Sequence, residues 1–456
     1  MTSPITGTTT PAGSGRCEVQ GIGVYGSPCW FTRSNFGGRF AAMLKYAGWD
    51  GIVIEGAADS LTWLNIIDNQ VTFEDAASLQ GLNTWETQES IWRMVTSDAR
   101  FGEWVAAGQA FTTQKPAVVC ISMAGENLAR VASLVHDAGN GAGQGGFGGI
   151  FGSKNLKAIS VLGTGSVPIA DPNALYATRQ WVDAERPHGI SSIHGYGGAG
   201  HLGPIGWPNS RNKGCVGCSA PCRAIYRDGI HNESQCFESF FVTVSNVQSQ
   251  GTVPKNKYSG DLMQMYGLNT CDLLSTMGYA SMPGGRPSYF HSLINMGVLG
   301  PGKAVESWPL PMERFSTKEF DEAFCKAVAY REGIGDDLAE GIGRAARKWG
   351  RFKEDTDDGR LYLPQWDYNW HHTLPTVEWT YGSLIGDRDI NEHRYWSLFS
   401  ADIYNAVPLE EILDIYAEKF APFTGDTLMF NYQWQGNEAW TEGISVSYTH
   451  LTLPTN

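Results

Sequence analysis

Residues 139–161 read Gly139-Asn-Gly-Ala-Gly-Gln-Gly-Gly-Phe-Gly-Gly-Ile-Phe-Gly152-Ser-Lys-Asn-Leu156-Lys-Ala-Ile-Ser-Val161. The stretch contains G-x-G-x-x-G at residues 141–146, the pattern of dinucleotide-binding turns, but further glycines follow where a helix would have to begin. We therefore expect a loop at 139–152 and a buried strand at 156–161. The loop is interpreted as a backbone nest for a phosphate or a polycyclic cofactor, or as a plain surface loop.

The residues around this stretch change from strand patterns to helix patterns along the chain. Before it, apolar alternation and turn residues predict strands at 50–56 and 117–122, a hairpin of 61–67 with 71–74, and helices at 39–46, 84–97 and 127–135. After Asp171, a residue suited to a helix N-cap, the patterns predict helices at 172–184, 260–278, 318–331, 336–349 and 409–420. This order predicts an α+β fold with a domain boundary at residues 163–171.

The composition excludes several classes of protein. The chain has 456 residues with 33 Lys and Arg against 47 Asp and Glu, so its net charge of −14 argues against nucleic acid or an anionic membrane as main partner. A hydrophobic fraction of 42% with 18% charged residues excludes disorder, and 9 cysteines are too few for a disulfide scaffold. No apolar run is long enough for a membrane span, and no export signal is visible. We therefore expect a cytoplasmic protein.

Three cysteines form the sharpest local motif, Cys215-Val-Gly-Cys218-Ser-Ala-Pro-Cys222. Three thiolates in a Gly/Pro loop can converge on one soft metal centre, and three close cysteines with a distant fourth commonly hold a 4Fe–4S cluster. A zinc site and buried free thiols are the alternatives. The candidates for the fourth ligand are Cys236, Cys271, Cys325 or a residue beyond the end of the chain.

Three further positions carry groups with functional potential. Asn35-Phe-Gly37-Gly38-Arg39 is a second glycine turn that leads into a helix, which suits either an anion or a simple helix cap. Glu238 opens a helix, where a carboxylate can serve chemistry or only favour the helix dipole. His393 is interpreted as an acid/base group or as a surface histidine.

Taken in order, several segments resemble the aldehyde ferredoxin oxidoreductase family of tungsten enzymes. The similarity includes the three cysteines and extends over roughly residues 3–350 in the same order along the chain. The matching segments are 3–7, 15–16, 34–38, 44–56, 124–128, 141–146, 152–159 and 335–341.

The resemblance implies a β-sheet-rich N-terminal domain that binds the first pterin of a tungsten (or molybdenum) bis-pterin cofactor, followed by α-helical domains. The implied reaction oxidises an aldehyde to a carboxylic acid, with ferredoxin or another iron–sulfur carrier as electron acceptor. A homodimer or an electron-transfer subunit complex is a further expectation. Cys215, Cys218 and Cys222 would bind the 4Fe–4S cluster, and Glu238 and His393 would be catalytic. The pterin-binding residues would be Arg16, Asn35, Gly37, Gly38, Gly143, Gln144, Gly145, Gly146, Gln264, Gly267, Leu268 and Asn269.

The sequence departs from the family pattern at two positions. The pterin-binding D-x-x-G-L segment has Gln264 in place of its leading Asp, although Asp261 lies one turn earlier. Cys271 is similar to a cysteine of the class II benzoyl-CoA reductase branch that ligates tungsten directly, and it would then be a metal ligand; an inert buried thiol is the alternative. The alternative functions are therefore low-potential reduction of an aromatic acyl-CoA, and an inactive fragment or non-catalytic binding module.

The expected organisation has four parts. Residues 1–165 form the pterin-binding β-rich domain and residues 170–365 an α-helical domain with the cluster cysteines. Residues 366–446 begin a third, truncated helical domain, and residues 447–456 resemble a translated sequencing adaptor more than native protein. We therefore expect the chain to be a piece of a longer protein.

Overall fold

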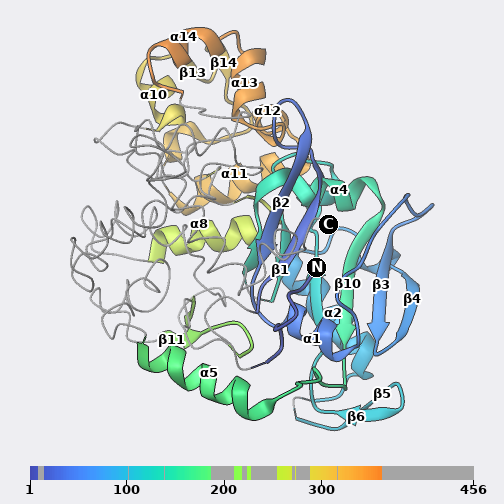
Figure 1. Cartoon of the computed structure of the whole chain (residues 1–456). Coiled ribbons are helices and arrows are strands. Elements are labelled where there is room, and N and C mark those ends of the chain that lie inside the picture. Colours follow the sequence, from blue (N-terminus) through green and yellow to red (C-terminus); the bar gives the residue numbers. More distant parts are fainter. Residues whose placement is uncertain are drawn as a thin grey trace.

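The computed structural model describes a large part of the chain, and Figure 1 shows its arrangement. The described residues are 1–8, 15–100, 102–137, 139–185, 210–217, 223–226, 254–269, 273, 288–315 and 317–361. Strands and helices are mixed within these ranges, which confirms the predicted α+β class. None of the described helices is long and apolar enough to cross a membrane.

A six-stranded sheet organises the N-terminal part, with the strand order β4-β3-β10-β7-β8-β9. Its centre is β10 (Leu156–Leu162), which is buried along its whole length, parallel to β3 and antiparallel to β7. The other strands are β3 (Thr62–Ile67), β4 (Gln70–Asp75), β7 (Ala117–Cys120), β8 (Leu134–His136) and β9 (Asn140–Ala142).

Helices cover both faces of this sheet, which explains why its central strands are buried on both sides. The side chains of β7 alternate: Val118 and Cys120 pack toward α2 (Thr84–Thr96), and Ala117 and Val119 pack toward α1 (Phe40–Tyr46). The short helix α4 (Phe147–Ser153) contacts β10 on the α1 side.

A two-stranded ribbon crosses the middle of the molecule (Figure 1). Its strands β1 (Cys17–Gly23) and β2 (Trp30–Phe36) pair antiparallel, with Cys17 opposite Phe36. The ribbon contacts β9, α4 and the 3-10 turn η2 (Gln144–Gly146). The C-terminal end of β2 is therefore held beside the glycine-dense stretch.

Helices dominate the second half of the described chain and share a core with the first half. Phe290, Phe320 and Phe324 pack in the same apolar cluster as Met123 and Val131. The helices are α5 (Pro172–Glu185), α8 (Pro254–Met265), α10 (Tyr289–Asn295), α11 (Lys318–Tyr330), α12 (Ile334–Ala339), α13 (Ile342–Lys348) and α14 (Phe352–Asp357). The smaller elements are η1 (Ala77–Leu79), α3 (Met123–Glu126), η5 (Met312–Arg314), and the strand pairs β5 (Val105–Ala107) with β6 (Ala110–Thr112), β11 (Ser210–Lys213) with β12 (Arg223–Tyr226), and β13 (Leu299–Gly300) with β14 (Val305–Glu306).

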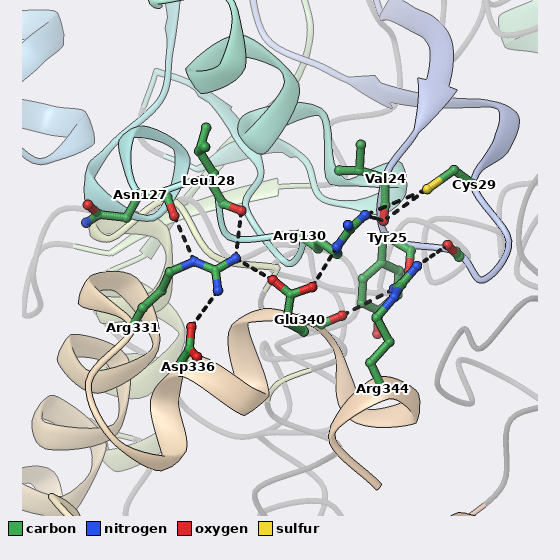
Figure 2. Close-up of polar contacts among 11 residues, drawn as sticks. Val24, Tyr25, Cys29, Asn127, Leu128, Arg130, Arg331, Asp336, Glu340 and Arg344 are labelled. Carbon is green, nitrogen blue, oxygen red and sulfur yellow. Dashed lines mark hydrogen bonds and ion pairs between the residues drawn. The ribbon is translucent and has the colours of Figure 1, made fainter. Parts of the chain in front are cut away.

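A polar network joins the two halves where α11 ends and α12 begins (Figure 2). Glu340 accepts hydrogen bonds from Arg130, at 2.7 Å, and from Arg331, at 2.5 Å. Arg331 also donates to the backbone carbonyls of Asn127 and Leu128, both before β8. One carboxylate thus links the segment before β8 to the helical half.

Three predictions about the N-terminal part were wrong. Residues 50–56 are not a strand, because they have no ladder partner, and Val53 is 88% exposed. A helix at 127–135 does not form, because Leu128 adopts a φ of 57° that ends α3, and the following residues enter the sheet as β8. The loop expected at 139–152 contains β9, η2 and α4, so a helix begins at Phe147 despite its glycines.

Two predicted helices are interrupted for one shared reason, a glycine with positive φ. Gly267, at a φ of 68°, follows the end of α8, so the helix expected at 260–278 is interrupted after Met265, and residues 270–272 and 274–278 lie outside the described part of the chain. Gly341, at a φ of 96°, divides the helix expected at 336–349 into α12 and α13. The helix expected at 409–420 lies outside the described residues.

Candidate functional site

The glycine turn after β2 lies at the junction of several segments that are distant in sequence. Asn35 is buried near the end of β2, and Gly37 and Gly38 connect this strand to α1. Gly38 has a φ of 90°, and a Cβ atom there would lie 2.7 Å from Cδ2 of His136. A Cβ atom on Gly37 would lie 3.0 Å from Oδ1 of Asn140. A side chain at either glycine would therefore force the turn away from β8 and β9.

Cys215 packs directly against this turn. Its Sγ accepts a hydrogen bond from the Gly38 backbone N–H at 3.3 Å, and Val216 N–H donates to the Gly38 carbonyl oxygen at 3.3 Å. A Cβ atom on Gly37 would lie 2.8 Å from Cys215 Sγ, so the thiol uses the space that glycine leaves. Gly15 also packs on Cys215, which brings the backbone of the neighbouring Arg16 to the same place.

Two strands bracket the cysteine motif. β11 ends at Lys213 and β12 begins at Arg223, and these two residues lie opposite each other in an antiparallel pair. Arg179 of α5 donates to the carbonyl oxygen of Gly217 at 2.9 Å. Cys215 is the one cysteine of the motif within the described residues, since Cys218 and Cys222 lie outside them.

The loop at residues 143–146 meets the segment after α8. A Cβ atom on Gly143 would lie 3.3 Å from Oδ1 of Asn269. Leu268 forms an antiparallel bridge with Ala132, and the Asn269 N–H donates to the Val131 carbonyl oxygen at 2.8 Å. The structure therefore brings together two segments that sequence reasoning selected separately, 143–146 and 264–269.

The need for glycine differs along this loop. Gly145 and Gly146 have φ angles of 80° and 73°, and a Cβ atom on Gly146 would lie 2.5 Å from the Arg130 carbonyl oxygen. The carbonyl oxygen of Gly145 accepts the Val24 N–H at 2.9 Å. Positive φ and close packing therefore require glycine at 145 and 146, while Gly143 lies against Asn269.

Two buried residues that sequence reasoning missed hold the turn in place. His136 has no exposed surface, and its Nε2 accepts hydrogen bonds from the N–H groups of Arg39 and Phe40, both at 3.2 Å. Asn140 lies opposite His136 in the β8–β9 pair and faces Gly37. The signal for His136 was a single polar residue in the apolar run Leu134-Val135-His136, and the wrong helix prediction at 127–135 concealed it.

A buried ion pair lies on the ribbon next to Asn35. Arg33 and Glu18 are 1% and 3% exposed, with Nη1 and Oε2 3.7 Å apart. Arg33 and Asn35 lie two residues apart on β2, so their side chains emerge on the same face of the ribbon. Glu18 balances the charge of the guanidinium, so the pair fixes this face of the ribbon beside the glycine turn.

The described cysteines differ in ionisation. Burial raises the pKa of the thiols of Cys17, Cys120 and Cys325, to about 12 for Cys120. For Cys325 the nearby Asp321 and Glu322 add to this effect. Cys215, by contrast, is partly exposed. Among the described residues there is no group of three or more metal-ligating side chains.

The remaining predicted site residues fall outside the described part of the chain. These are the catalytic candidates Glu238 and His393 and the metal-ligand candidates Cys218, Cys222 and Cys271, with Cys236 as a further cluster candidate. Their roles stay predictions.

Comparison with known families gives consistent matches over most of the chain. The family model described as aldehyde ferredoxin oxidoreductase, N-terminal domain, matches residues 1–163, and that for domains 2 and 3 matches residues 153–358. The tungsten-containing aldehyde ferredoxin oxidoreductase of Pyrococcus furiosus is 29% identical over 400 residues, which are 80% of this chain and 60% of that protein. The Thermococcus kodakarensis enzyme of the same name is 28% identical over 403 residues, with the same coverage. The chain thus spans about 60% of the length of these relatives.

A solved structure has the same fold. It is described as the active site complex BamBC of benzoyl coenzyme A reductase with 1,5-dienoyl-CoA, and it aligns with a TM-score of 0.64. The alignment covers 94% of this chain and 66% of the other, at 20% sequence identity. At that identity the similarity concerns the fold alone.

Proposed function

The chain belongs to the aldehyde ferredoxin oxidoreductase family, and from this premise we propose that it is part of a tungsten–pterin and 4Fe–4S oxidoreductase. The proposed reaction oxidises an aldehyde to a carboxylic acid and passes electrons to ferredoxin or another iron–sulfur carrier. The observation that carries the proposal is the contact of Cys215 with the Gly37–Gly38 turn. This contact supports a site in which the cluster thiolate of Cys215 lies directly beside the glycines expected to bind the pterin.

The segment 264–269 fits a pterin. Gln264 is 3% exposed, and its Oε1 has no hydrogen-bond partner among the described residues. A buried amide oxygen of this kind needs a donor, and a pterin ring carries several N–H groups. Gln264 replaces the Asp of the family pattern; its amide can both donate and accept, whereas a carboxylate only accepts. Asn269, next to Gly143, supplies a second amide.

The surroundings of Cys215 fit a cluster ligand. A thiolate that accepts a backbone N–H is the usual arrangement at iron–sulfur ligands. Lys213 and Arg223 lie opposite each other in the β11–β12 pair. Cys215 follows Lys213 by two residues and Cys222 directly precedes Arg223, so this pairing supports a shared metal centre for the two cysteines.

The reaction places different demands on the chain's residues. When bound, the tungsten centre would supply Lewis-acid and two-electron chemistry. The side-chain amides of Asn35 and Asn269 would orient the cofactor. Proton transfer is assigned to Glu238 and His393 by resemblance alone. A carboxylate and an imidazole are suited to this role when their pKa values lie near the working pH.

A second candidate function rests on Cys271, two residues after Asn269. Because Asn269 lies against Gly143, a thiolate shortly after it would be suited to ligate tungsten directly. That chemistry favours low-potential reduction of an aromatic acyl-CoA. Loss of tungsten in Cys271→Ala would support this candidate, whereas retained tungsten with aldehyde oxidation would support the first.

Metal analysis of the full-length protein, purified anaerobically, tests the proposed function. We expect about one tungsten and about four iron atoms per chain, and Cys218→Ser should lose the cluster absorbance. Zinc in place of tungsten and iron would contradict the proposal and would favour a non-catalytic module. An anaerobic assay with a panel of aldehydes and aryl-CoA thioesters then identifies the substrate class.

A further inference from the structure

His136 has a chemical environment that fixes its protonation at each ring nitrogen. Nδ1 lies 2.7 Å from the Val118 carbonyl oxygen, so this nitrogen must carry a proton and donate it. Nε2 faces two backbone N–H groups, those of Arg39 and Phe40. Nε2 is therefore an acceptor, although Asp137 Oδ2 lies 3.3 Å from it. The Asp137 carboxylate instead accepts a hydrogen bond from Arg39 Nε at 3.2 Å.

The imidazole acts as the cap of α1. The first N–H groups of a helix have no partner within the helix, and the Arg39 side chain, at the N-cap position, does not cap them. The acceptor instead comes from β8, 97 residues away in sequence. The ring is enclosed by Phe36 and Phe40, with centroids 5.9 Å and 5.8 Å from its own. Its position is therefore set by the sheet and by packing on both sides of the turn.

This cap fixes the residue that contacts Cys215. Gly38 directly precedes the two capped N–H groups, and its own N–H donates to Cys215 Sγ. If the cap were lost, the backbone at Arg39 and Phe40 could rotate, and the Gly38 N–H would leave the sulfur. His136 and Cys215 are thus coupled through three consecutive peptide units.

We propose that His136 is a positioning residue that holds the Gly38 N–H on Cys215 Sγ and thereby raises the reduction potential of the cluster. The inference rests on the proposed function, because it requires a cluster at Cys215. Reduction adds negative charge to the cluster sulfurs, so an N–H donor stabilises the reduced form more than the oxidised form. Removal of that donor shifts the potential to a more negative value.

Two substitutions at His136 distinguish the acceptor role of Nε2 from the other contacts of the imidazole ring. His136→Asn keeps an amide near Nδ1, which can still donate to the Val118 carbonyl, but ends short of the Arg39 and Phe40 N–H groups. His136→Gln reaches the position of Nε2 with an oxygen acceptor. Leu134→Ala, on the same strand and also buried, is the control for a general loss of sheet stability.

The test is a redox titration of the full-length protein, monitored by electron paramagnetic resonance. In His136→Asn the ratio of reduced to oxidised cluster at a fixed potential should fall about tenfold, which is about 59 mV for a one-electron couple. His136→Gln and Leu134→Ala should titrate close to wild type. An unchanged potential in His136→Asn, or an equal shift in Leu134→Ala, would overturn the inference and leave the proposed function intact.

Two further outcomes keep the result unambiguous. A wild-type protein without any cluster signal would overturn the proposed function, and with it this inference. If His136→Asn does not fold, hydrogen exchange of the wild-type protein decides. The Arg39 and Phe40 N–H groups should exchange slowly, and exchange at the rate of an exposed loop would contradict the cap.

Discussion

Glu340→Gln tests how the two halves of the molecule are held together. The carboxylate accepts hydrogen bonds from Arg130 and Arg331, and about a third of each of the Glu340 and Arg130 side chains is exposed (Figure 2). Hydrogen bonds to charged groups contribute about 1.5–3 kcal/mol each when buried. Exposed ion pairs contribute about 0–1 kcal/mol.

The expected cost lies between these limits. The substituted amide would keep one acceptor but lose the charge, and Arg331 would still bond to Asp336 and to two backbone carbonyls. We therefore expect a loss of about 1–2 kcal/mol in the free energy of unfolding. The matched control is Glu89→Gln, which removes an exposed pair with Arg93 and should cost less than about 0.5 kcal/mol.

Native-state hydrogen exchange measures this local effect directly. The Arg130 N–H donates to the Ala339 carbonyl oxygen at 2.8 Å, across the same junction. In Glu340→Gln its exchange should be about 5–30 times faster than in wild type, as follows from a loss of 1–2 kcal/mol. Exchange equal to that of the Glu89→Gln control would refute the argument that this carboxylate joins the halves.

Three other predictions follow from the described contacts. Burial opposes ionisation of Glu340, but Arg331 and Arg130 outweigh burial and hold the pKa of this carboxyl below its ordinary value of 4.5. The ionised carboxylate therefore stabilises the fold above pH 4.5, and this stabilisation is lost as the pH falls through the lowered pKa of the folded protein. Acid unfolding should accordingly be less steep in Glu340→Gln than in wild type. Lys157 is fully buried and bonds to Glu126 and to a backbone carbonyl. Lys157→Met should lower the free energy of unfolding in urea by about 3–5 kcal/mol, because it leaves the Glu126 carboxylate without its buried partner. The double variant Lys157→Met with Glu126→Gln should lose less, because no unpaired charge remains. Gly152→Ala should lower the thermal midpoint and the free energy of unfolding, by about 1–3 kcal/mol, because its Cβ would overlap the backbone oxygen of Gly125 in α3. Gly21→Ala should cost much less, because the nearest contact of its Cβ would be at 3.6 Å.

The sheet could be predicted from the sequence because its signals are local. β10 and β7 are short apolar runs between turn residues, and both are observed within a few residues of the expected bounds. The helix expected at 84–97 is observed as α2, with Asn83 and Glu86 forming a capping box at its start. These elements depend on neighbours in sequence, which is why a pattern reveals them.

The elements that were wrong depend on distant partners. The glycines of α4 indicated a loop, but Gly148 and Gly152 allow that helix to pack directly on backbone atoms before β8. The role of His136 depends on a turn 97 residues away, and that of Cys215 on a turn 177 residues away. No local pattern contains such contacts. The cysteine spacing and the glycine motifs could select segments of the site but not the residues that hold them together.

We propose that the Gly37–Gly38 turn and Cys215 together hold the iron–sulfur cluster and the tungsten cofactor. The most direct test is the iron and tungsten content of Gly37→Ala against Gly21→Ala, each purified anaerobically as the full-length protein. A Cβ atom at residue 37 would lie 2.8 Å from Cys215 Sγ, whereas one at residue 21 makes only an ordinary contact. We predict that Gly37→Ala loses iron and tungsten together while Gly21→Ala keeps both. Equal metal contents in the two variants would show that this turn does not hold the two metal centres.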